Sequence, residues 1–517
     1  VILTYYSLLL FMSGQFDFNG LFTFEMANNH QGNIEHGKRI IKEIADVIKN
    51  HGLKKTALKL QFRDLNTFIH PAFKESNENK HIKRFLSTSM SEDQFKELVD
   101  EIRRQGMLTM CTPFDEASVD QIARLSIDII KIGSCSATDW PLLEKAAGAG
   151  KPIIVSTGGL NIKDIDNLVS FLDHRYVNFA IMHCVSIYPT PLEKFALDKV
   201  EILRERYPNV TIGFSTHEDP NNFDVIKMAY AKGARIFERH VGVPTETIKL
   251  NSYSSTPDQI ASWIKAHQEA VSICAIEPEQ TNSQEQSELK ALMRGVYTKN
   301  EIKAGEEIRR DAVFFAMPAL EGQLLSGEWR QGMLADKDYT PLSGLAEQLA
   351  QGKPHKKNII YQAIHNIKGM LNTSRIAVGS EFDVEMSHHY GIDKFNETGV
   401  TIINCINREY CKKILVLLPG QKHPNHHHMK KEETFQILSG TLDVELDGKK
   451  RTLQPGDTLV VQRGVKHKFW SNGGAIFEEV STTHFNDDSI YDDPAINAMA
   501  REMRKTKLIN WGRHQFD

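Results

Sequence analysis

An α/β fold class, with a (β/α)8 TIM barrel ahead of two β-rich modules, is predicted by three features of this 517-residue sequence. In residues 20–280, short apolar runs alternate with amphipathic stretches, as expected for repeated βα units. Two polar segments, 277–288 and 346–358, then interrupt the apolar pattern. Beyond the second segment, apolar residues alternate along short runs that Asp-Gly and Pro-Gly-Asp turns separate.

Eight apolar runs are the strand candidates of the barrel. In chain order they are LFTFEM, TALKLQ, MLTMC, DIIKIG, PIIVST, VNFAIMHC, VTIGFS and ARIFERH. Stretches 34–50 and 91–106 have the periodicity of amphipathic helices. Eight strands with their crossovers in about 250 residues favour a TIM barrel over an open sheet. The segment 66–89 is long, polar and rich in His and Lys, and we expect it to be a lid over a site.

The chain divides into four predicted parts. Residues 1–19 form an irregular start, 20–280 the barrel, 288–345 a small β-rich module and 365–517 an all-β domain. The first 12 residues are apolar, but they lack the basic segment and cleavage site of a signal peptide. They are also shorter than the ~20 residues that span a bilayer. We therefore expect no membrane association.

Composition narrows the class of partner. The 62 Lys+Arg and 66 Asp+Glu leave a net charge of −4, and no basic stripe interleaved with aromatics occurs, so nucleic acid is not expected as a partner. The six cysteines form no CxxC pair, which argues against a disulfide framework and favours a reducing cytoplasmic location. Small molecules are the expected ligands.

The carboxyl ends of the predicted strands carry the polar side chains. In a TIM barrel this end holds the active site. Glu25 ends the first strand, and Lys59 and Gln61 share one face of the second because strand side chains alternate. Later strands end in hydroxyl and glycine motifs such as KIGSCS and STGG. A single lysine can be a paired core residue and a single STGG only a turn, but their repetition at one end predicts a phosphate site of ammonium groups and backbone N–H donors.

Two histidines close the last two strands. His217 and His240 lie on strands adjacent around the barrel, about 4.8 Å apart. Imidazoles so placed can share a divalent cation, and Glu238 points the same way.

The motifs NNHQG, KLQ, CTPFD, KIGS, STGG, HCVSIYPTP, GFSTH and ERH, in this order, resemble those of the sialic acid synthases over about residues 20–275. RGVYTKNEIKAGEEI resembles the antifreeze-like (SAF) domain that follows those barrels. The resemblance implies condensation of phosphoenolpyruvate with an aldose to a nonulosonic acid. It also implies a homodimer in which each SAF domain lies over the partner's barrel. The residues implied to bind phosphoenolpyruvate or shape its site are Lys59, Gln61, Thr112, Lys131, Ser134, Ser156, Ser186, Tyr188 and Ser215.

The resemblance further implies a barrel metal held by His217 and His240, with Mn as the expected ion and Mg or Co as alternatives. The metal would polarise the aldehyde carbonyl as a Lewis acid. C3 of phosphoenolpyruvate would attack it, water would add at C2, and phosphate would leave with C–O cleavage. Glu25 is the candidate for moving the proton of the water or of a sugar hydroxyl.

Three positions depart from the family pattern. Ser136 stands where a glutamate is usual, Leu250 lies near the position of an acidic residue after the last strand, and Met317 aligns with the arginine of the SAF domain. These changes predict intact phosphoenolpyruvate binding but an altered sugar pocket.

Residues 420–440 and 455–470 resemble the two cupin motifs, with Gln462 where a proline is commoner. His426 and His428 point to one face of a strand, and Glu433 and His467 complete a predicted set of ligands for a second divalent transition metal: Mn, Fe, Ni or Zn. A cupin that binds no metal is the alternative. The domain could be a sugar isomerase, an epimerase or a sugar-binding appendage. For the whole chain the alternatives to a synthase are a bifunctional enzyme and a sugar-binding protein with a non-catalytic barrel.

Overall fold

The computed structural model describes residues 15–74, 79–275, 282–351, 356–379 and 381–511. The chain forms two compact units, Val1–Gln280 and Thr281–Asp517. The apolar opening, residues 1–12, lies outside the described residues. Within the described part of the chain, no helix is long and apolar enough to cross a membrane.

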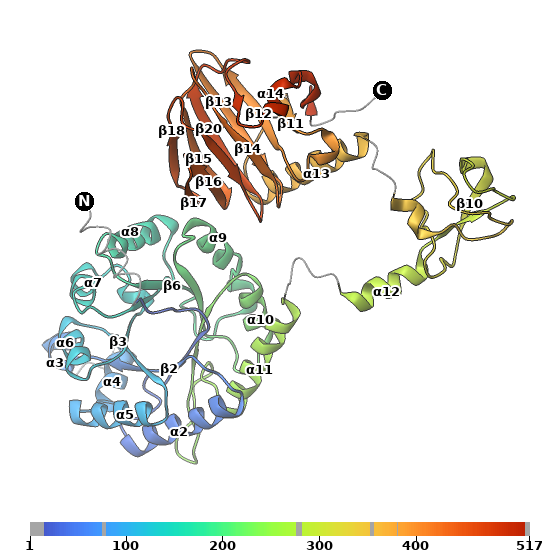
Figure 1. Ribbon diagram of the computed structural model, residues 1–517. Helices are drawn as coiled ribbons and strands as arrows, with labels where there is room; N and C mark the ends of the chain where they lie inside the picture. The colour runs from blue at the N-terminus through green and yellow to red at the C-terminus, as the bar shows by residue number, and fades with distance from the viewer. Residues whose placement is uncertain (1–14, 75–78, 276–281, 352–355, 380, 512–517) are drawn as a thin grey trace. The chain divides into compact units, whose positions relative to one another are not determined.

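The first unit is a closed barrel of eight parallel strands that neighbour one another in chain order (Figure 1). Each predicted apolar run forms one strand, and the predicted TIM barrel is confirmed. The strands are β1 (Leu21–Glu25), β2 (Thr56–Phe62), β3 (Leu108–Pro113), β4 (Ile129–Ile132), β5 (Ile153–Ser156), β6 (Phe179–Cys184), β7 (Thr211–Thr216) and β8 (Ile236–His240).

Helices surround the ring of strands (Figure 1). They are α2 (Ile34–Asn50), α3 (Leu65–Phe68), α4 (Lys80–Ser87), α5 (Glu92–Arg104), α6 (Glu116–Arg124), α7 (Trp140–Ala147), α8 (Ile162–Asp173), α9 (Asp198–Arg206), α10 (Asp224–Ala231) and α11 (Pro257–Ile273). Helix α2 shows why such segments are helical. The Asn33 side chain caps the first turn by accepting from the His36 N–H, and Ile40, Ile44 and Ile48 form a buried stripe at helical spacing.

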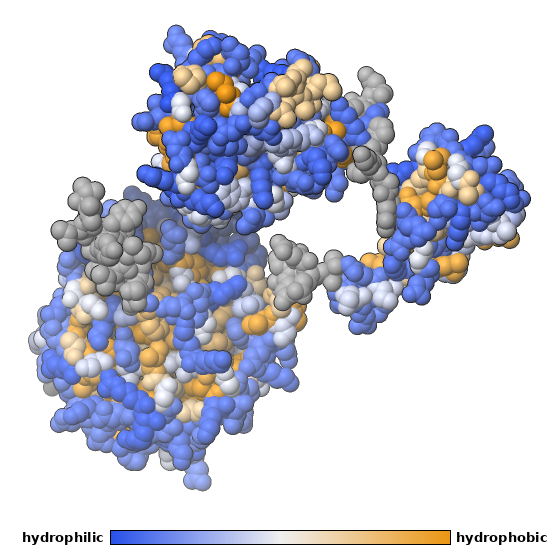
Figure 2. Space-filling model, viewed as in Figure 1, coloured by the Kyte–Doolittle hydropathy of each residue, from blue (hydrophilic) through white to orange (hydrophobic). Residues whose placement is uncertain are grey.

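The interior of the barrel is apolar at the amino ends of the strands and polar at the carboxyl ends. An apolar cluster that includes Leu21, Met110, Ile154 and Ile236 fills the first end. In the space-filling view, apolar side chains are seen inside a largely hydrophilic rim (Figure 2). Among the described residues, the polar part of the barrel interior is therefore at the carboxyl end.

The segment 66–89 is more helical than the predicted lid loop. It contains parts of α3, a 3-10 turn at Pro71–Phe73 and α4. The Arg63 guanidinium lies 4.0 Å from the ring centroid of Phe85 and 3.7 Å from that of Phe114. Helix α4 is thereby packed beside the carboxyl ends of β2 and β3, at the mouth of the barrel.

The second unit begins with α12 (Ser283–Leu292) and a β-rich module. Strands β9 (Gly295–Thr298) and β10 (Val313–Ala316) pair antiparallel. Single β-bridges such as Ile302 with Tyr339 extend this pairing, and a small core including Val296 and Leu324 fills the module.

The rest of the second unit consists of two antiparallel sheets, as predicted for the all-β domain. One sheet has the order β18-β15-β20-β13-β12-β11-β22 and the other β17-β16-β19-β14-β21. The strands are β11 (Asp383–Ser387), β12 (Val400–Asn407), β13 (Tyr410–Leu417), β14 (Lys422–His427), β15 (Glu433–Gly440), β16 (Leu442–Leu446), β17 (Lys449–Leu453), β18 (Thr458–Val461), β19 (His467–Trp470), β20 (Ala475–Thr482), β21 (Ile490–Tyr491) and β22 (Lys505–Leu508).

Two helices accompany these sheets, α13 (Lys356–Thr373) and α14 (Pro494–Ala498). Helix α13 starts inside the segment that we expected to be a linker and runs across the expected domain start at 365. Ile360, Ile364, Ile367 and Leu371 on it are buried in one core with side chains of the larger sheet. The helical spacing of these residues is the signal that reveals it.

Candidate functional site

A lysine between two carboxylates lies at the carboxyl end of the barrel. Lys59 Nζ is 2.6 Å from Glu25 Oε2 and 2.7 Å from Glu238 Oε1, and all three side chains are buried. Ser215 Oγ donates to Glu238 Oε1 at 3.2 Å. Glu238 lies on the same face of β8 as His240, as predicted. Its contacts with Lys59 and Ser215 occupy one of its two carboxylate oxygens.

The two carboxyl groups of this cluster differ. Burial would raise the pKa of Glu238, but Lys131 and Lys59 outweigh it and lower the pKa to about 2. At Glu25 burial prevails over Lys59, and its pKa is raised. Burial also opposes the charge of Lys59, yet Glu238 and Glu25 raise the pKa of that ammonium overall. Glu238 therefore stays ionised, while Glu25 is the carboxyl group suited to exchanging a proton.

A second buried lysine stands on β4. Lys131 Nζ donates to Ser156 Oγ at 2.6 Å and lies 3.8 Å from Glu238 Oε2. Burial lowers its pKa. It also donates to the Ile132 carbonyl oxygen at 3.4 Å. The ammonium group thus has neutral hydrogen-bond partners and a carboxylate only at 3.8 Å, which leaves it available to an anion.

Gly158 lies two residues after Ser156 and against two serine hydroxyls. Its N–H donates to Ser134 Oγ at 3.0 Å. A Cβ atom on Gly158 would lie 2.8 Å from Ser134 Oγ and 2.6 Å from Ser186 Oγ, closer than any normal contact. Backbone and hydroxyl groups can approach this closely only because the residue is glycine. Next to Lys131, they form a cradle that suits a phosphate or carboxylate group.

Two further predicted residues border this region. Gln61 Nε2 donates to Glu25 Oε2 at 3.4 Å, and Gln61 Oε1 accepts from Arg63 Nη2 at 2.8 Å. Thr112 is buried, and its Oγ1 has no hydrogen-bond partner within the described part of the chain. An unpaired buried hydroxyl is a group that a ligand can satisfy.

The histidine pair fits a divalent metal ion. The ring centroids of His217 and His240 are 5.3 Å apart. His217 Nδ1 lies 3.0 Å from the Val185 carbonyl oxygen, which orients that ring, and His240 Nδ1 is buried with no partner among the described residues. Burial lowers the pKa of each to about 3, so both are neutral, as metal ligands must be.

Aromatic rings cover this pair. Tyr188 lies 4.2 Å from His217 and Tyr253 lies 5.1 Å from His240, measured between ring centroids. Burial raises the pKa of Tyr188, which keeps its phenol protonated. Tyr253 was not among the predicted residues, because it lies in the loop after β8, where no periodic pattern indicates which side chain turns inward.

Two of the three unusual positions belong to the barrel unit. Ser136 is buried after β4. Leu250 packs toward Gly242, where a Cβ atom would lie 2.6 Å from Leu250 Cδ2 and 3.2 Å from Asn29 Nδ2. Met317 is in the second unit, with 58% of its surface exposed.

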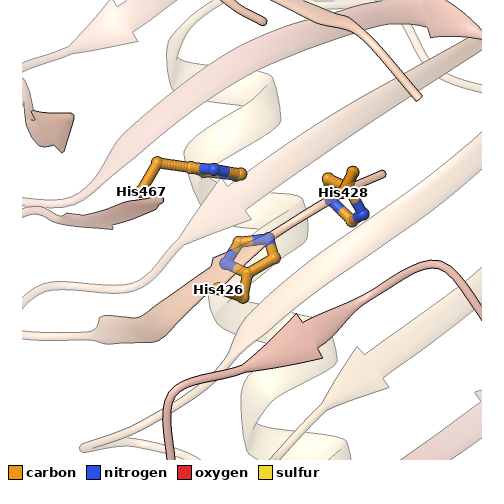
Figure 3. Close-up of side chains that lie close together, drawn as sticks. All are labelled: His426, His428 and His467. Atoms are coloured by element: carbon orange, nitrogen blue, oxygen red, sulfur yellow. The ribbon is translucent and has the colours of Figure 1, made fainter. Parts of the chain in front are cut away.

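The cupin-like domain carries a histidine cluster. His426, His428 and His467 are buried, and one nitrogen from each lies within 4.8 Å of the others. Figure 3 shows the three rings grouped together, with His467 coming from a different strand than His426. Among the described residues this is the one group of three His, Cys, Asp or Glu that meets this spacing, and it could bind a metal.

Glu433, the fourth predicted ligand, borders the cluster. Its Oε1 lies 3.4 Å from His428 Nε2 and its Oε2 lies 3.2 Å from His467 Nε2. Lys431 forms an ion pair with the same carboxylate. Burial opposes the charge of Glu433, but Lys431 and the histidines hold its pKa well below the ordinary value. An ionised carboxylate beside the imidazoles completes a donor set that a divalent transition metal accepts.

A cavity of 370 Å³ opens between the two sheets at this cluster. Lys431 and Lys413 both pair with Glu479, at 3.0 and 3.2 Å. Lys505 and Arg501 share Glu385. Sequence reasoning missed these residues, although Lys413 and Glu479 occupy inward positions of alternating strands, where an apolar residue is the usual choice.

Comparisons with known proteins agree with this geometry. Residues 44–277 match the NeuB family and residues 413–481 the cupin domain family. The chain is 43% identical to a crystallised protein described as spore coat polysaccharide biosynthesis protein E of Chromobacterium violaceum, over 63% of this chain and 98% of that one, with a TM-score of 0.61.

Two relatives have named activities. One is the N-acetylneuraminate-9-phosphate synthase of Drosophila melanogaster, 33% identical over 42% of this chain and 58% of the relative. The other is the N,N'-diacetyllegionaminic acid synthase of Campylobacter jejuni, 25% identical over 61% of this chain and 95% of the relative. The chain therefore belongs to the NeuB family of sialic acid synthase-type enzymes, and it carries a cupin domain in addition to its barrel.

Proposed function

We propose that the barrel condenses phosphoenolpyruvate with an aldose to give a nonulosonic, 3-deoxy-2-keto acid and inorganic phosphate. The observation that carries the proposal is the cradle around Gly158, with Ser134 and Ser186, beside the buried ammonium of Lys131. This cradle lies at the same end of the barrel as the two neutral histidines, His217 and His240. Anion binding and carbonyl activation are the two requirements of this reaction.

The chain's own residues have separate tasks. Lys131, Ser156 and the cradle hold the anionic groups of phosphoenolpyruvate, with Thr112 adding its unpaired hydroxyl. Lys131 and Lys59 together keep Glu238 ionised, and Lys59 is itself fixed between two carboxylates. This rigid charge arrangement fixes the substrate's orientation without reorganisation during the reaction.

His217 and His240 would hold a divalent ion, Mn by preference and Mg or Co as alternatives; such an ion supplies Lewis-acid polarisation of an aldehyde carbonyl. A bond forms between C3 of phosphoenolpyruvate and the aldehyde carbon, whose oxygen becomes a hydroxyl by taking up a proton. Water adds at C2, and the C2–O bond to phosphate breaks with phosphate as the leaving group. Glu25, with its raised pKa, carries the proton released by that water.

Phosphate release from phosphoenolpyruvate, measured with a panel of aldoses, tests the proposal. Lys131→Met is the matched loss-of-function control. It removes the Lys131 ammonium group, and because no ionised partner lies at hydrogen-bond distance from that group, no carboxylate loses a direct hydrogen bond. Saturable, aldose-dependent phosphate release that this variant lacks supports a synthase. Sugar binding without phosphate release by the wild-type chain would instead identify a sugar-binding protein with a non-catalytic barrel.

The cupin domain has a second candidate activity, sugar isomerisation or epimerisation, which would make the chain bifunctional. The polar cavity beside His426, His428, His467 and Glu433 favours it over a purely structural role, and those residues would hold a second divalent transition metal. Incubating the metal-loaded chain with single aldoses, without phosphoenolpyruvate, and resolving the products by chromatography tests this activity.

We also propose that the chain forms a homodimer. In it, the SAF-like module of each subunit, residues 288–345, would lie over the barrel of the partner. Light scattering that finds only monomer at assay concentration contradicts it.

A further inference from the structure

The cavity of the cupin domain extends beyond its histidine cluster and has a charged far end. Glu433 lies on β15 and Glu385 on β11, with β20, β13 and β12 between them in the same sheet. At about 4.8 Å a strand, the two backbones are roughly 19 Å apart, and long side chains reach inward between them. One elongated polar ligand can therefore contact both ends of the cavity, whose volume of 370 Å³ is that of a small-molecule site.

The part of the cavity beside the histidine cluster is polar but electrically balanced. Lys413 and Lys431 face the carboxylates of Glu433 and Glu479, two positive charges against two negative ones. Each partner is buried. Such paired groups can hydrogen-bond the hydroxyl groups of a sugar, and they give no preference for a charged ligand over a neutral one.

The far end is not balanced. Lys505 and Arg501 both approach Glu385, so two positive charges share one negative charge. The remaining charged side chains that line this end are Asp383 and Lys507, one of each sign, and both are exposed at the rim. One positive charge is in excess, before any metal ion at the histidines is counted. A partly buried charge without a partner is costly, and a bound anion offsets that cost.

We propose that the cupin cavity binds an anionic sugar, with hydroxyl or carbonyl oxygens toward the histidine cluster and a carboxylate or phosphate group on Arg501 and Lys505. Arg501 keeps 24% of its side-chain surface exposed and Lys505 15%, so the anionic group enters where water still reaches. The guanidinium group presents a planar set of donors that suits either anion. The inference concerns the cupin alone and does not depend on turnover in the barrel.

Calorimetric titration of the full-length, manganese-loaded protein tests this with three probes: a hexose 6-phosphate, a hexonate and the corresponding neutral hexose. We expect at least one anionic probe to bind tenfold or more tightly than the neutral hexose. The tighter of the two anions identifies whether phosphate or carboxylate is the recognised group. Equal affinities for all three probes, or no binding of any, overturn the proposal.

Two substitutions should change the affinity in opposite directions. Arg501→Gln removes the excess charge and should weaken binding of the preferred anion at least tenfold. Glu385→Gln adds one more uncompensated positive charge and should strengthen it about threefold or more. The control is Lys412→Gln, on β13 but paired with Glu478 on the other face of the sheet, which should leave affinity within twofold.

A cooperative thermal unfolding transition is required of each variant as evidence that it is folded. A lost affinity can then be attributed to the substituted side chain. An affinity unchanged by Arg501→Gln places the bound anion elsewhere, for example in the barrel cradle, and refutes the proposal. Weaker anion binding by a folded Glu385→Gln variant also refutes it, since excess charge would then not be the cause.

Discussion

Replacing Gly158 with alanine is the sharpest test of the anion cradle. The φ angle of Gly158 is not among the positive values that favour glycine, so an added Cβ causes no backbone strain. It would, however, lie 2.6 Å from Ser186 Oγ, 2.8 Å from Ser134 Oγ and 3.2 Å from the Cys184 carbonyl oxygen. The serine hydroxyls can rotate away, so the chain should fold, but the cradle then loses its donors.

The magnitude follows from the hydrogen bonds lost. A hydrogen bond to a charged group contributes about 1.5–3 kcal/mol, and each 1.4 kcal/mol is a factor of ten. Losing one such bond to phosphoenolpyruvate should raise its KM about 10- to 150-fold. Initial rates of phosphate release over a range of phosphoenolpyruvate concentrations, at saturating aldose, measure it.

Gly159→Ala is the control. Gly159 has a φ of +79°, and a Cβ there would meet no atom within 4 Å. The substitution should cost about 1–2 kcal/mol of unfolding free energy through strain, while KM for phosphoenolpyruvate stays unchanged. A KM within twofold of wild type for Gly158→Ala, or an equal increase for Gly159→Ala, would refute the assignment of the cradle.

Four further outcomes are expected. His217→Ala or His240→Ala should abolish condensation with an unchanged circular dichroism spectrum; full activity of both in chelator-treated, manganese-free buffer contradicts the barrel metal. The double variant His426→Ala/His428→Ala should lose one bound metal per chain by elemental analysis, and complete loss of phosphate release would mean that the domains share a site. In competition assays resolved by mass, N-acetylmannosamine should be a poor acceptor, by up to roughly 10⁴-fold in kcat/KM, because Ser136, Leu250 and Met317 are apolar or shorter than the polar residues that the family pattern leads us to expect against the sugar. Finally, the pKa of His217 is lowered to about 3 in the folded protein, against 6.5 in the unfolded chain. The unfolded chain therefore binds a proton at a higher pH than the folded protein does. The free energy of unfolding that His217 contributes above pH 6.5 is for this reason lost as the pH drops toward 3. His240 and other buried histidines contribute in the same way, so urea unfolding of the metal-free protein at pH 7 and 5 should show a loss that is about 2 kcal/mol larger than the loss in His217→Ala. An identical loss in the variant contradicts this assignment.

Local sequence was sufficient to predict the barrel and the end of it at which the candidate site residues gather. Eight apolar runs with intervening helical periodicity predict eight parallel strands, and the strand period alone places Lys59 and Gln61 on one face. Because parallel strands of a closed barrel all end at the same mouth, residues such as Glu25, Lys131 and His240 must meet there whatever their separation in sequence.

The cupin cavity is different, because its charges come from strands whose neighbours are not set by chain order. Lys413 and Glu479 face each other only because β13 pairs with β20, 66 residues later in the chain. Glu385 meets Lys505 across β11 and β22, which are 120 residues apart. Sequence spacing identified the histidine motif, since its ligands are local to one strand and its neighbours. Only the tertiary structure decided which buried charges are balanced and which are in excess, because antiparallel pairing between distant strands, and not periodicity, determines which side chains share a cavity.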